Sequence, residues 1–361
     1  MNNEDCLELL RELVRIPSPS YEEEAVVDCV SGWLTAQGIA LTTPNGNIVA
    51  VAAEPDPAKP TLALTAHLDT VPPASGYSRD PYDAGTKPGF IRGLGANDDG
   101  GSVVSMLAAF RHFLGKPLAI NLVLLLVREE ECSGPHGTRW LFGPEGPFQK
   151  GALPMPDWAI VGEPTGLKAA TSERGLLVLD GEAIGVSGHA ARGEGVNAIY
   201  LALEDIATLQ AHHFPKVSKE MGEVRVSVTQ IHAGTAHNVV PDRCRFVVDI
   251  RPTEQYAPAE ILAELQALCR SKLTARNLLH RASATRPDSP LRKAAAALGL
   301  ETFSSQTSSD WMLLPCDAVK IGPGDSARSH RADEYIRTDE IYAGIETYIH
   351  LIEQLHAYTL E

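Results

Sequence analysis

Residues 120–131 read INLVLLLVREEE, an almost unbroken apolar run that ends in three consecutive glutamates. A run this short and this apolar is typical of a strand that is buried on both faces of a sheet. Three adjacent carboxylates at the end of such a strand repel one another unless a cation neutralises them, although a solvated run of charge is the alternative. The stretch therefore predicts a central strand with a candidate cation site directly after it.

The sequence around this strand alternates between helix and strand patterns. Helices are expected, from apolar residues at helical spacing, over residues 6–14, 22–37 and 102–114. Buried strands are expected, from short apolar stretches, at residues 48–53, 62–66 and 158–161. A loop rich in Gly, Pro and Asp covers residues 72–101. The alternation predicts an α/β fold, in which ligands gather at the carboxyl ends of the strands.

The pattern changes between residues 171 and 280, which predicts an inserted two-layer α+β domain. The expected strands there are 176–186, 224–231 and 245–250, and the expected helices are 197–210 and 258–270. The α/β pattern then resumes with a strand at 318–321 and a helix at 338–356. A chain of 361 residues exceeds the usual size of one core. We therefore predict a catalytic domain formed by residues 1–170 and 281–361, interrupted by the insert.

Composition narrows the class of protein. The formal net charge of −15 argues against binding to nucleic acid, which relies on Lys and Arg. No apolar run approaches the roughly 20 residues of a membrane span, and the acidic start of the chain does not resemble a secretory signal. The six cysteines are scattered without a Cys-x-x-Cys pair. We expect a cytoplasmic protein with reduced thiols and a small-molecule partner.

His67 and Asp69 follow the strand expected at residues 62–66. Residues two apart on an extended backbone point to the same side, so the imidazole and the carboxylate can meet. A carboxylate that accepts the second ring N–H of a metal-bound histidine fixes its tautomer and raises its basicity. A loop histidine beside an ordinary acid is the alternative.

Further candidate ligands follow in order along the chain. Asp98 and Asp99 stand just before the helix expected at residue 102, which either of them could instead cap. Glu163 follows the strand at 158–161, and His330 follows a glycine-rich turn. Carboxylates mixed with imidazoles suit Zn²⁺, Co²⁺ or Mn²⁺ better than Ca²⁺. Each residue alone could be surface decoration, but their order at successive strand ends predicts a metal site.

Several segments together resemble the co-catalytic zinc deacylases and carboxypeptidases, a family that includes acetylornithine deacetylase, succinyl-diaminopimelate desuccinylase and aminoacylases. The segments are TAHLDTVP (65–72), RGLGANDD (92–99), EEE (129–131), VGEPT (161–165), SGHAA (187–191), NVVPD (238–242) and GPG (322–324) ahead of His330. The resemblance covers nearly the whole chain. It implies a zinc-peptidase-like α/β catalytic domain with an inserted domain that acts as a lid and forms a homodimer.

The resemblance also implies roles for individual residues. His67, Asp98 and Glu163 would hold one zinc, and Asp98, Glu131 and His330 the other, which gives two Zn²⁺ per subunit; Co²⁺ or Mn²⁺ could substitute. Glu130 would be the general base, Asp69 the partner of His67, and His189 a group supplied to the other subunit's site. Arg174, Asn238 and Arg251 would line the substrate pocket. A one-residue shift, with Glu129 as base and Glu130 as ligand, stays open.

By the same resemblance, the reaction is hydrolysis of the amide bond of an N-acyl amino acid. The substrates implied are N-acetyl or N-succinyl derivatives of ornithine, citrulline, lysine or diaminopimelate, in amino-acid biosynthesis such as that of arginine. The chain departs from the family after Asp98, where Lys or Met-Lys often follows but this chain has Asp99-Gly100-Gly101, and at Ser329, where Ala is common. Two alternatives remain: a zinc di- or tripeptidase or carboxypeptidase, and a zinc-stabilised binding protein without catalysis.

Overall fold

The computed structural model describes residues 4–360, and the chain divides into two compact units. The first unit contains the chain up to Thr171, residues 284–303 and the chain from Ser309 onward. The second unit contains residues 172–283 and 304–308. The insert expected from the sequence covered residues 171–280.

The first unit is built on a large mixed sheet with the strand order β1-β2-β5-β3-β6-β16-β7-β14, and β15 pairs with β7. The central pairs β3–β5, β3–β6 and β6–β16 are parallel. The strands are β1 (Leu41–Thr42), β2 (Ile48–Val51), β3 (Thr61–His67), β5 (Asn121–Val127), β6 (Trp158–Val161), β7 (Ala169–Glu173), β14 (Ser283–Ala284), β15 (Thr302–Ser305) and β16 (Asp317–Lys320). The run at 120–127 therefore forms the buried strand β5, as its composition predicted.

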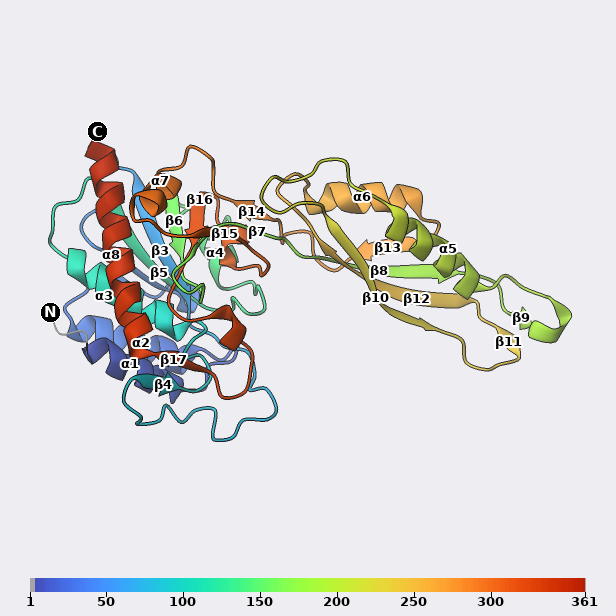
Figure 1. The fold of residues 1–361 in the computed structure, drawn as a ribbon, viewed down its shortest axis with the longest axis horizontal. Helices are drawn as coiled ribbons and strands as arrows, with labels where there is room; N and C mark the ends of the chain where they lie inside the picture. The colour runs from blue at the N-terminus through green and yellow to red at the C-terminus, as the bar shows by residue number, and fades with distance from the viewer. Residues whose placement is uncertain (1–3, 361) are drawn as a thin grey trace. The chain divides into compact units, whose positions relative to one another are not determined.

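Helices cover one face of this sheet (Figure 1). They are α1 (Glu4–Val14), α2 (Glu24–Ala36), α3 (Gly100–Phe113), α7 (Pro290–Ala297) and α8 (Thr338–Leu360). Their apolar residues form one cluster with the strand residues of that face, such as Leu64 and Leu124. The opposite face packs against the short helix α4 (Thr138–Leu141) and the 3-10 turn η3 (Asp310–Leu313).

The expected loop at residues 72–101 is not entirely irregular. Phe90–Arg92 forms β4, which pairs antiparallel with β17 (Tyr335–Arg337) near the other end of the chain. The helix expected at residue 102 begins at Gly100. Short strands such as β4 carry too few residues for a periodic apolar pattern, so the sequence alone did not indicate them.

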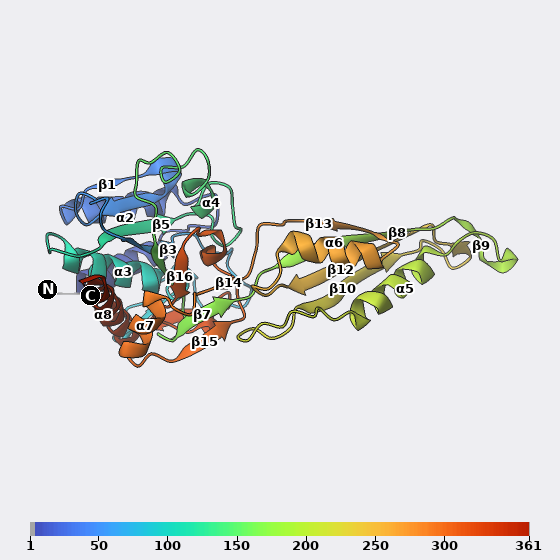
Figure 2. The ribbon, with the colours of Figure 1, turned by 90° about the horizontal axis from the view of Figure 1, so that it is seen from above.

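The second unit has a four-stranded antiparallel sheet in the order β10-β12-β8-β13, with helices α5 and α6 on one face (Figure 2). The elements are β8 (Leu177–Ile184), α5 (Ala198–Ala211), β10 (Arg225–Ala233), β12 (Arg243–Arg251), α6 (Pro258–Leu268) and β13 (Lys272–Ala275). A separate two-stranded antiparallel sheet pairs β9 (Gly188–His189) with β11 (Val239–Val240). Along β8, inward and outward residues alternate, as expected for a sheet with one covered face.

The predicted mixed α/β architecture is confirmed, while the dimerising role of the second unit stays a prediction. Among residues 4–360, no helix is both long enough and apolar enough to cross a bilayer. Strand register then sets the place of the site: His67 lies opposite Val127, and Thr65 lies opposite Val161. The segments that follow β3, β5 and β6 therefore leave the sheet at the same edge.

Candidate metal centre

His67 stands at the end of β3 and is 3% exposed. Its Nε2 lies 3.2 Å from Oδ1 of Asp98, and its Nδ1 lies 2.8 Å from the backbone oxygen of Asp69. The Asp69 carboxylate is further from Nδ1, at 3.5 Å, so the carbonyl is the closer acceptor. An Nδ1–H that donates to this carbonyl leaves Nε2 unprotonated and able to bind a metal ion. Although burial opposes the charged ring, both carboxylates raise the pKa of His67.

Asp98 lies next to His67 at the start of α3 and is 8% exposed. Burial alone would raise its pKa, but the hydrogen bond with His67 lowers it overall. Asp99 occupies the N-cap position of α3, yet its side chain makes no capping hydrogen bond. Burial raises the pKa of Asp99 to about 7. The capping alternative for this pair is therefore not what the structure shows.

Glu130 and Glu163 line one small cavity together with His67. Burial, reinforced by the charge of Glu163, raises the pKa of Glu130 well above its ordinary range. Burial also raises the pKa of Glu163, and Asp98 adds to the effect. Both side chains are only partly exposed and line this cavity, so they are not part of a fully solvated run of charge. Crowded carboxylates of this kind are the environment that a cation stabilises.

Glu131 and His330 complete the cluster from the other side. The Nε2 atom of His330 lies 3.0 Å from Oε1 of Glu131 and 3.7 Å from Oδ2 of Asp98. His330 has a positive φ of 57° and a half-exposed side chain. The hydrogen bond with Glu131 raises the pKa of the His330 ring.

Ligand atoms that lie within 4.8 Å of one another form two overlapping groups among the described residues. One group is His67, Asp98 and Glu131; the other is His67, Glu130 and Glu163. The donor set of carboxylates and imidazoles fits zinc, cobalt or manganese. All five residues predicted as ligands thus lie close together, and Glu130 lies among them. Which of them bind each ion stays a prediction.

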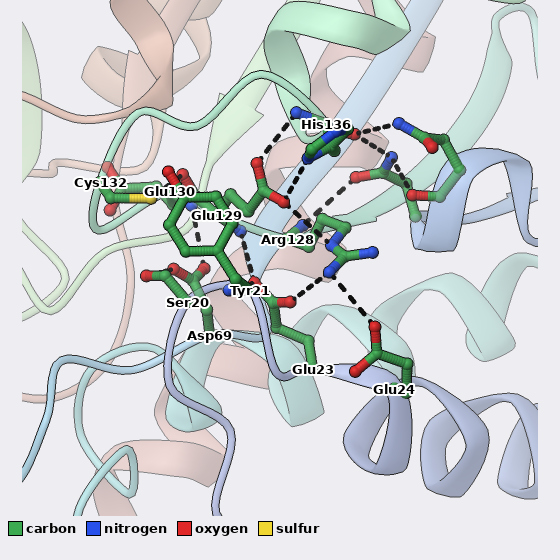
Figure 3. A network of polar contacts seen from close by, with 12 residues as sticks. Ser20, Tyr21, Glu23, Glu24, Asp69, Arg128, Glu129, Glu130, Cys132 and His136 are labelled. Carbon is green, nitrogen blue, oxygen red and sulfur yellow. Dashed lines mark hydrogen bonds and ion pairs between the residues drawn. The ribbon is translucent and has the colours of Figure 1, made fainter.

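Glu129 differs from the two glutamates that follow it. Its carboxylate accepts hydrogen bonds from the backbone N–H of His136 at 2.9 Å and from the His136 ring at 2.8 Å, as Figure 3 shows. The side chain is fully buried and also lies 3.4 Å from Arg128. Glu129 is therefore engaged outside both ligand groups, which favours Glu130 and Glu131 over Glu129 and Glu130 as the base and ligand.

The four residues predicted in the insert all belong to the second unit. His189 on β9 and Asn238 just before β11 are exposed, and Ala190 N donates to the Asn238 backbone oxygen. Arg251 is partly exposed and makes a two-point contact with Asp249. Arg174 is 3% exposed, and its guanidinium donates to the backbone oxygens of Met221, Glu223 and Arg251. Arg174 thus stabilises the backbone of neighbouring segments, a role that the sequence did not indicate.

Three charged residues near the centre were missed by the sequence reasoning. Asp310 in η3 accepts a hydrogen bond from Thr138 at 2.6 Å, and its charge adds to the raised pKa of Glu130. Glu334 accepts the backbone N–H groups of Asn97 and Asp98. Lys320 on β16 is 1% exposed, and its charge partly offsets the raised pKa of Glu163. A lysine inside the apolar run 318–321 was a usable signal; the other two carried none.

Comparison with known proteins matches residues 63–354, most of the chain, to the model of peptidase family M20/M25/M40. The chain belongs to this family. Among M20 relatives, a succinyl-diaminopimelate desuccinylase of Xanthomonas oryzae pv. oryzae (strain MAFF 311018) is 29% identical over 379 residues, which cover 97% of this chain and 99% of that protein. The resemblance inferred from the sequence motifs is thereby confirmed.

Solved structures of M20-type proteins share the fold. An aminopeptidase PepT from Bacillus cereus has a TM-score of 0.76 at 18% identity, covering 98% of this chain and 99% of that one. An M20 family metallo-carboxypeptidase from Sulfolobus solfataricus has a TM-score of 0.75 at 18% identity, covering 99% of this chain and all of that one. At such identities the likeness concerns the fold. Membership in M20 makes this protein a metal-binding hydrolase.

Proposed function

We propose that this M20 hydrolase cleaves the amide bond of an N-acyl amino acid, with an N-succinyl amino acid such as N-succinyl-diaminopimelate as its first candidate substrate. The observation that carries the proposal is the pair of ligand groups that share His67, with the raised-pKa carboxyl of Glu130 in one of them. The desuccinylase relative, which aligns over almost its full length, supports the choice of acyl group.

Two zinc ions are the cofactor that we propose, held by the five predicted ligands. Metal ions bound there supply Lewis acidity, which acidifies a water molecule and polarises the scissile carbonyl. Asp98 contacts both His67 and His330, and in this proposal it would be the ligand that both ions share. Co²⁺ or Mn²⁺ would suit the same donors.

Glu130 is the residue that we propose as general base. It takes a proton from the attacking water and passes it to the departing nitrogen. Without this proton the nitrogen would have to leave as an amide anion, which is a poor leaving group. A raised pKa suits this double role, because the carboxyl must both accept and release a proton near neutral pH. Asp69 orients His67 through the Nδ1 contact described above.

The second unit supplies the proposed substrate contacts. The His189 ring accepts the N–H of Ala191 at Nδ1, which places the ring proton on Nε2 and makes it available to a developing oxyanion. Arg251 offers a planar guanidinium to a substrate carboxylate. Asn238 lies on the strand segment next to His189.

A homodimer formed through the second unit is part of the proposal. β10 is an edge strand of its sheet, and edge strands tend to pair with another chain. Ile231 on β10 is 46% exposed, and Tyr200 and Leu203 on α5 are 66% and 50% exposed. Light scattering after size exclusion is expected to give a dimer for the wild type and a monomer for Ile231→Lys. A monomeric wild type at micromolar concentration contradicts this part.

The activity test is amine release from a panel of N-succinyl and N-acetyl amino acids, with dipeptides and tripeptides alongside. Zinc-loaded, cobalt-loaded and chelator-treated protein are compared on every substrate. We expect metal-dependent release from an N-succinyl amino acid. Release from peptides alone would move the protein to the peptidase branch of M20. No release from any substrate, by protein shown to contain zinc, would favour a binding protein.

A further inference from the structure

The backbone that carries the three glutamates is held by carboxylates from elsewhere in the first unit. The N–H of Glu130 donates to Oδ1 of Asp69 at 2.9 Å, and the N–H of Glu131 donates to Oδ2 at 3.1 Å. The N–H of Glu129 donates to Oε1 of Glu23 at 3.1 Å. Three consecutive backbone donors are therefore fixed by two buried side chains (Figure 3).

Glu23 is fully buried just before α2 and has no role in the metal cluster. Its Oε1 also accepts the N–H of Tyr21 at 3.0 Å, and its Oε2 lies 2.7 Å from the guanidinium of Arg128. Ser20 in the same turn makes a further hydrogen bond, in which its hydroxyl donates to Oδ2 of Asp69 at 2.7 Å. The turn at residues 20–23 thus holds the strand end both through Glu23 and through Asp69.

The conformation of Glu129 explains why these hydrogen bonds to the backbone matter. Its φ of 60° lies in the left-handed region, which a residue with a side chain rarely adopts and which persists only when its surroundings enforce it. This turn sends the Glu129 carboxylate toward His136, while Glu130 points into the cavity that His67 lines. Relaxing the turn would move the two glutamates that follow it.

We propose that Glu23 is a positioning residue that fixes the left-handed turn at Glu129 and thereby the places of Glu130 and Glu131. The expected effect on kcat rests on the proposed function. The role in fixing the backbone does not, because Glu23 itself takes no part in the chemistry. Glu23 precedes residue 63, where the match to the family model begins. Its role is read from the contacts of this chain.

The chain offers a matched control in the neighbouring residue. Glu24 also lies near Arg128, at 3.5 Å, but its side chain is 73% exposed and no contact joins it to the backbone of residues 129–131 among the described interactions. Glu24→Ala removes the same number of atoms and the same charge as Glu23→Ala. Glu23→Gln keeps an oxygen that can accept both N–H groups but turns its amide donors toward Arg128, so we expect an intermediate effect.

Hydrogen–deuterium exchange of the metal-free proteins tests the backbone claim without any substrate. We expect the peptide spanning residues 128–134 to exchange faster in Glu23→Ala than in wild type, less so in Glu23→Gln, and unchanged in Glu24→Ala. Peptides from β3 and from α8 serve as internal references for global unfolding. Equal protection of residues 128–134 in wild type and Glu23→Ala, in folded protein, would overturn the proposal.

Zinc affinity and kinetics test the consequence. We expect Glu23→Ala to lose about 10–100-fold in zinc affinity or in kcat at full zinc loading, with KM changed far less, as for other partners that orient metal ligands. A Glu23→Ala enzyme with wild-type kcat and zinc affinity overturns the inference even if its melting temperature falls. If wild type hydrolyses no N-acyl amino acid but Glu23→Ala still loosens residues 128–134 and weakens zinc, the proposed function fails and the positioning role stands.

Discussion

Glu334 accepts the backbone N–H of Asp98 at 3.0 Å, and the same oxygen accepts that of Asn97 at 2.8 Å. This carboxylate is 2% exposed and holds the backbone of the candidate bridging ligand from a segment more than 200 positions later in the chain. Burial raises its pKa to about 7. The position of Asp98 therefore depends on a residue that lies outside both ligand groups found among the described residues.

Replacing Glu334 should weaken metal binding. In Glu334→Ala the two N–H groups lose their acceptor, so Asp98 can shift, and we expect zinc affinity to fall by about 10–100-fold. Titration of the metal-free variant with zinc against a chromophoric chelator measures the change. Asp333→Asn is the control, because Asp333 contacts the exposed Ser78 and should bind zinc like wild type. Equal zinc affinity for Glu334→Ala and wild type would refute this account.

Glu130 and Glu131 should separate into a base and a ligand. Glu130→Gln is expected to lower kcat by about 10²–10⁴-fold while keeping the zinc content, since a carboxamide cannot take up a proton. Glu131→Gln is expected to lower the zinc content as well as the rate. Metal analysis beside single-substrate kinetics gives both values. The pattern reversed, with zinc lost in Glu130→Gln and retained in Glu131→Gln, would assign the roles the other way.

The metal-free protein should become less stable as pH rises from about 5 to about 7.5. Burial raises the pKa of Asp99 and of Glu334 to about 7, and the pKa of His67 is also raised. The folded state then binds more protons than the unfolded state in this window, so the free energy of unfolding falls with pH. Bound metal neutralises the carboxylates, so its stabilising effect should grow over the same range.

Thermal melting of the chelator-treated and zinc-loaded forms across this pH range measures the effect. We expect the melting temperature of the chelator-treated form to fall with pH, and the zinc-induced increase to widen. A metal-free melting temperature that rises steadily from pH 5 to 7.5 would mean that other groups dominate the linkage.

Arg174 and Arg251 should respond differently to replacement by lysine. Arg174→Lys removes several hydrogen bonds to buried carbonyls and is expected to lower the free energy of unfolding by roughly 1–3 kcal/mol, with little change in KM. Arg251→Lys is expected to raise KM by about tenfold or more with little loss of stability, because lysine cannot bind a carboxylate through two parallel N–H groups. Denaturant titration and initial-rate kinetics distinguish the two. An unchanged KM in Arg251→Lys would remove it from the substrate pocket.

Much of the centre could be predicted because its residues follow buried strands. The apolar runs that form β3, β5 and β6 are long enough to recognise, and parallel register brings their ends to one edge. His67, Glu130 and Glu163 were found in this way. Asp98 and His330 lie in loops without periodicity, so they were candidates only from their residue type and their order along the chain, and the family resemblance then gave them their roles.

Two of the residues that were missed act through the backbone. Glu23 and Glu334 accept N–H groups from segments far away in the sequence, and nothing in their own neighbourhood indicates a partner. Arg174 was assigned to the substrate pocket by the family resemblance, and the structure shows that its guanidinium donates to three backbone carbonyl oxygens. The chemistry of a side chain can be inferred from the sequence. The backbone N–H groups of irregular segments also need acceptors, and only the structure shows which side chains supply them.

The parallel strand order has a further consequence for how the protein matures. The candidate ligands come from residues 67, 98, 131, 163 and 330, so no short segment of the chain holds more than one of them. An unfolded or nascent chain therefore has no local site to capture zinc, unlike a zinc finger, whose ligands lie close enough in sequence to organise the fold around the ion. We therefore expect the sheet, which pairs strands over long sequence separations, to assemble first and the metal to bind a chain that has already folded.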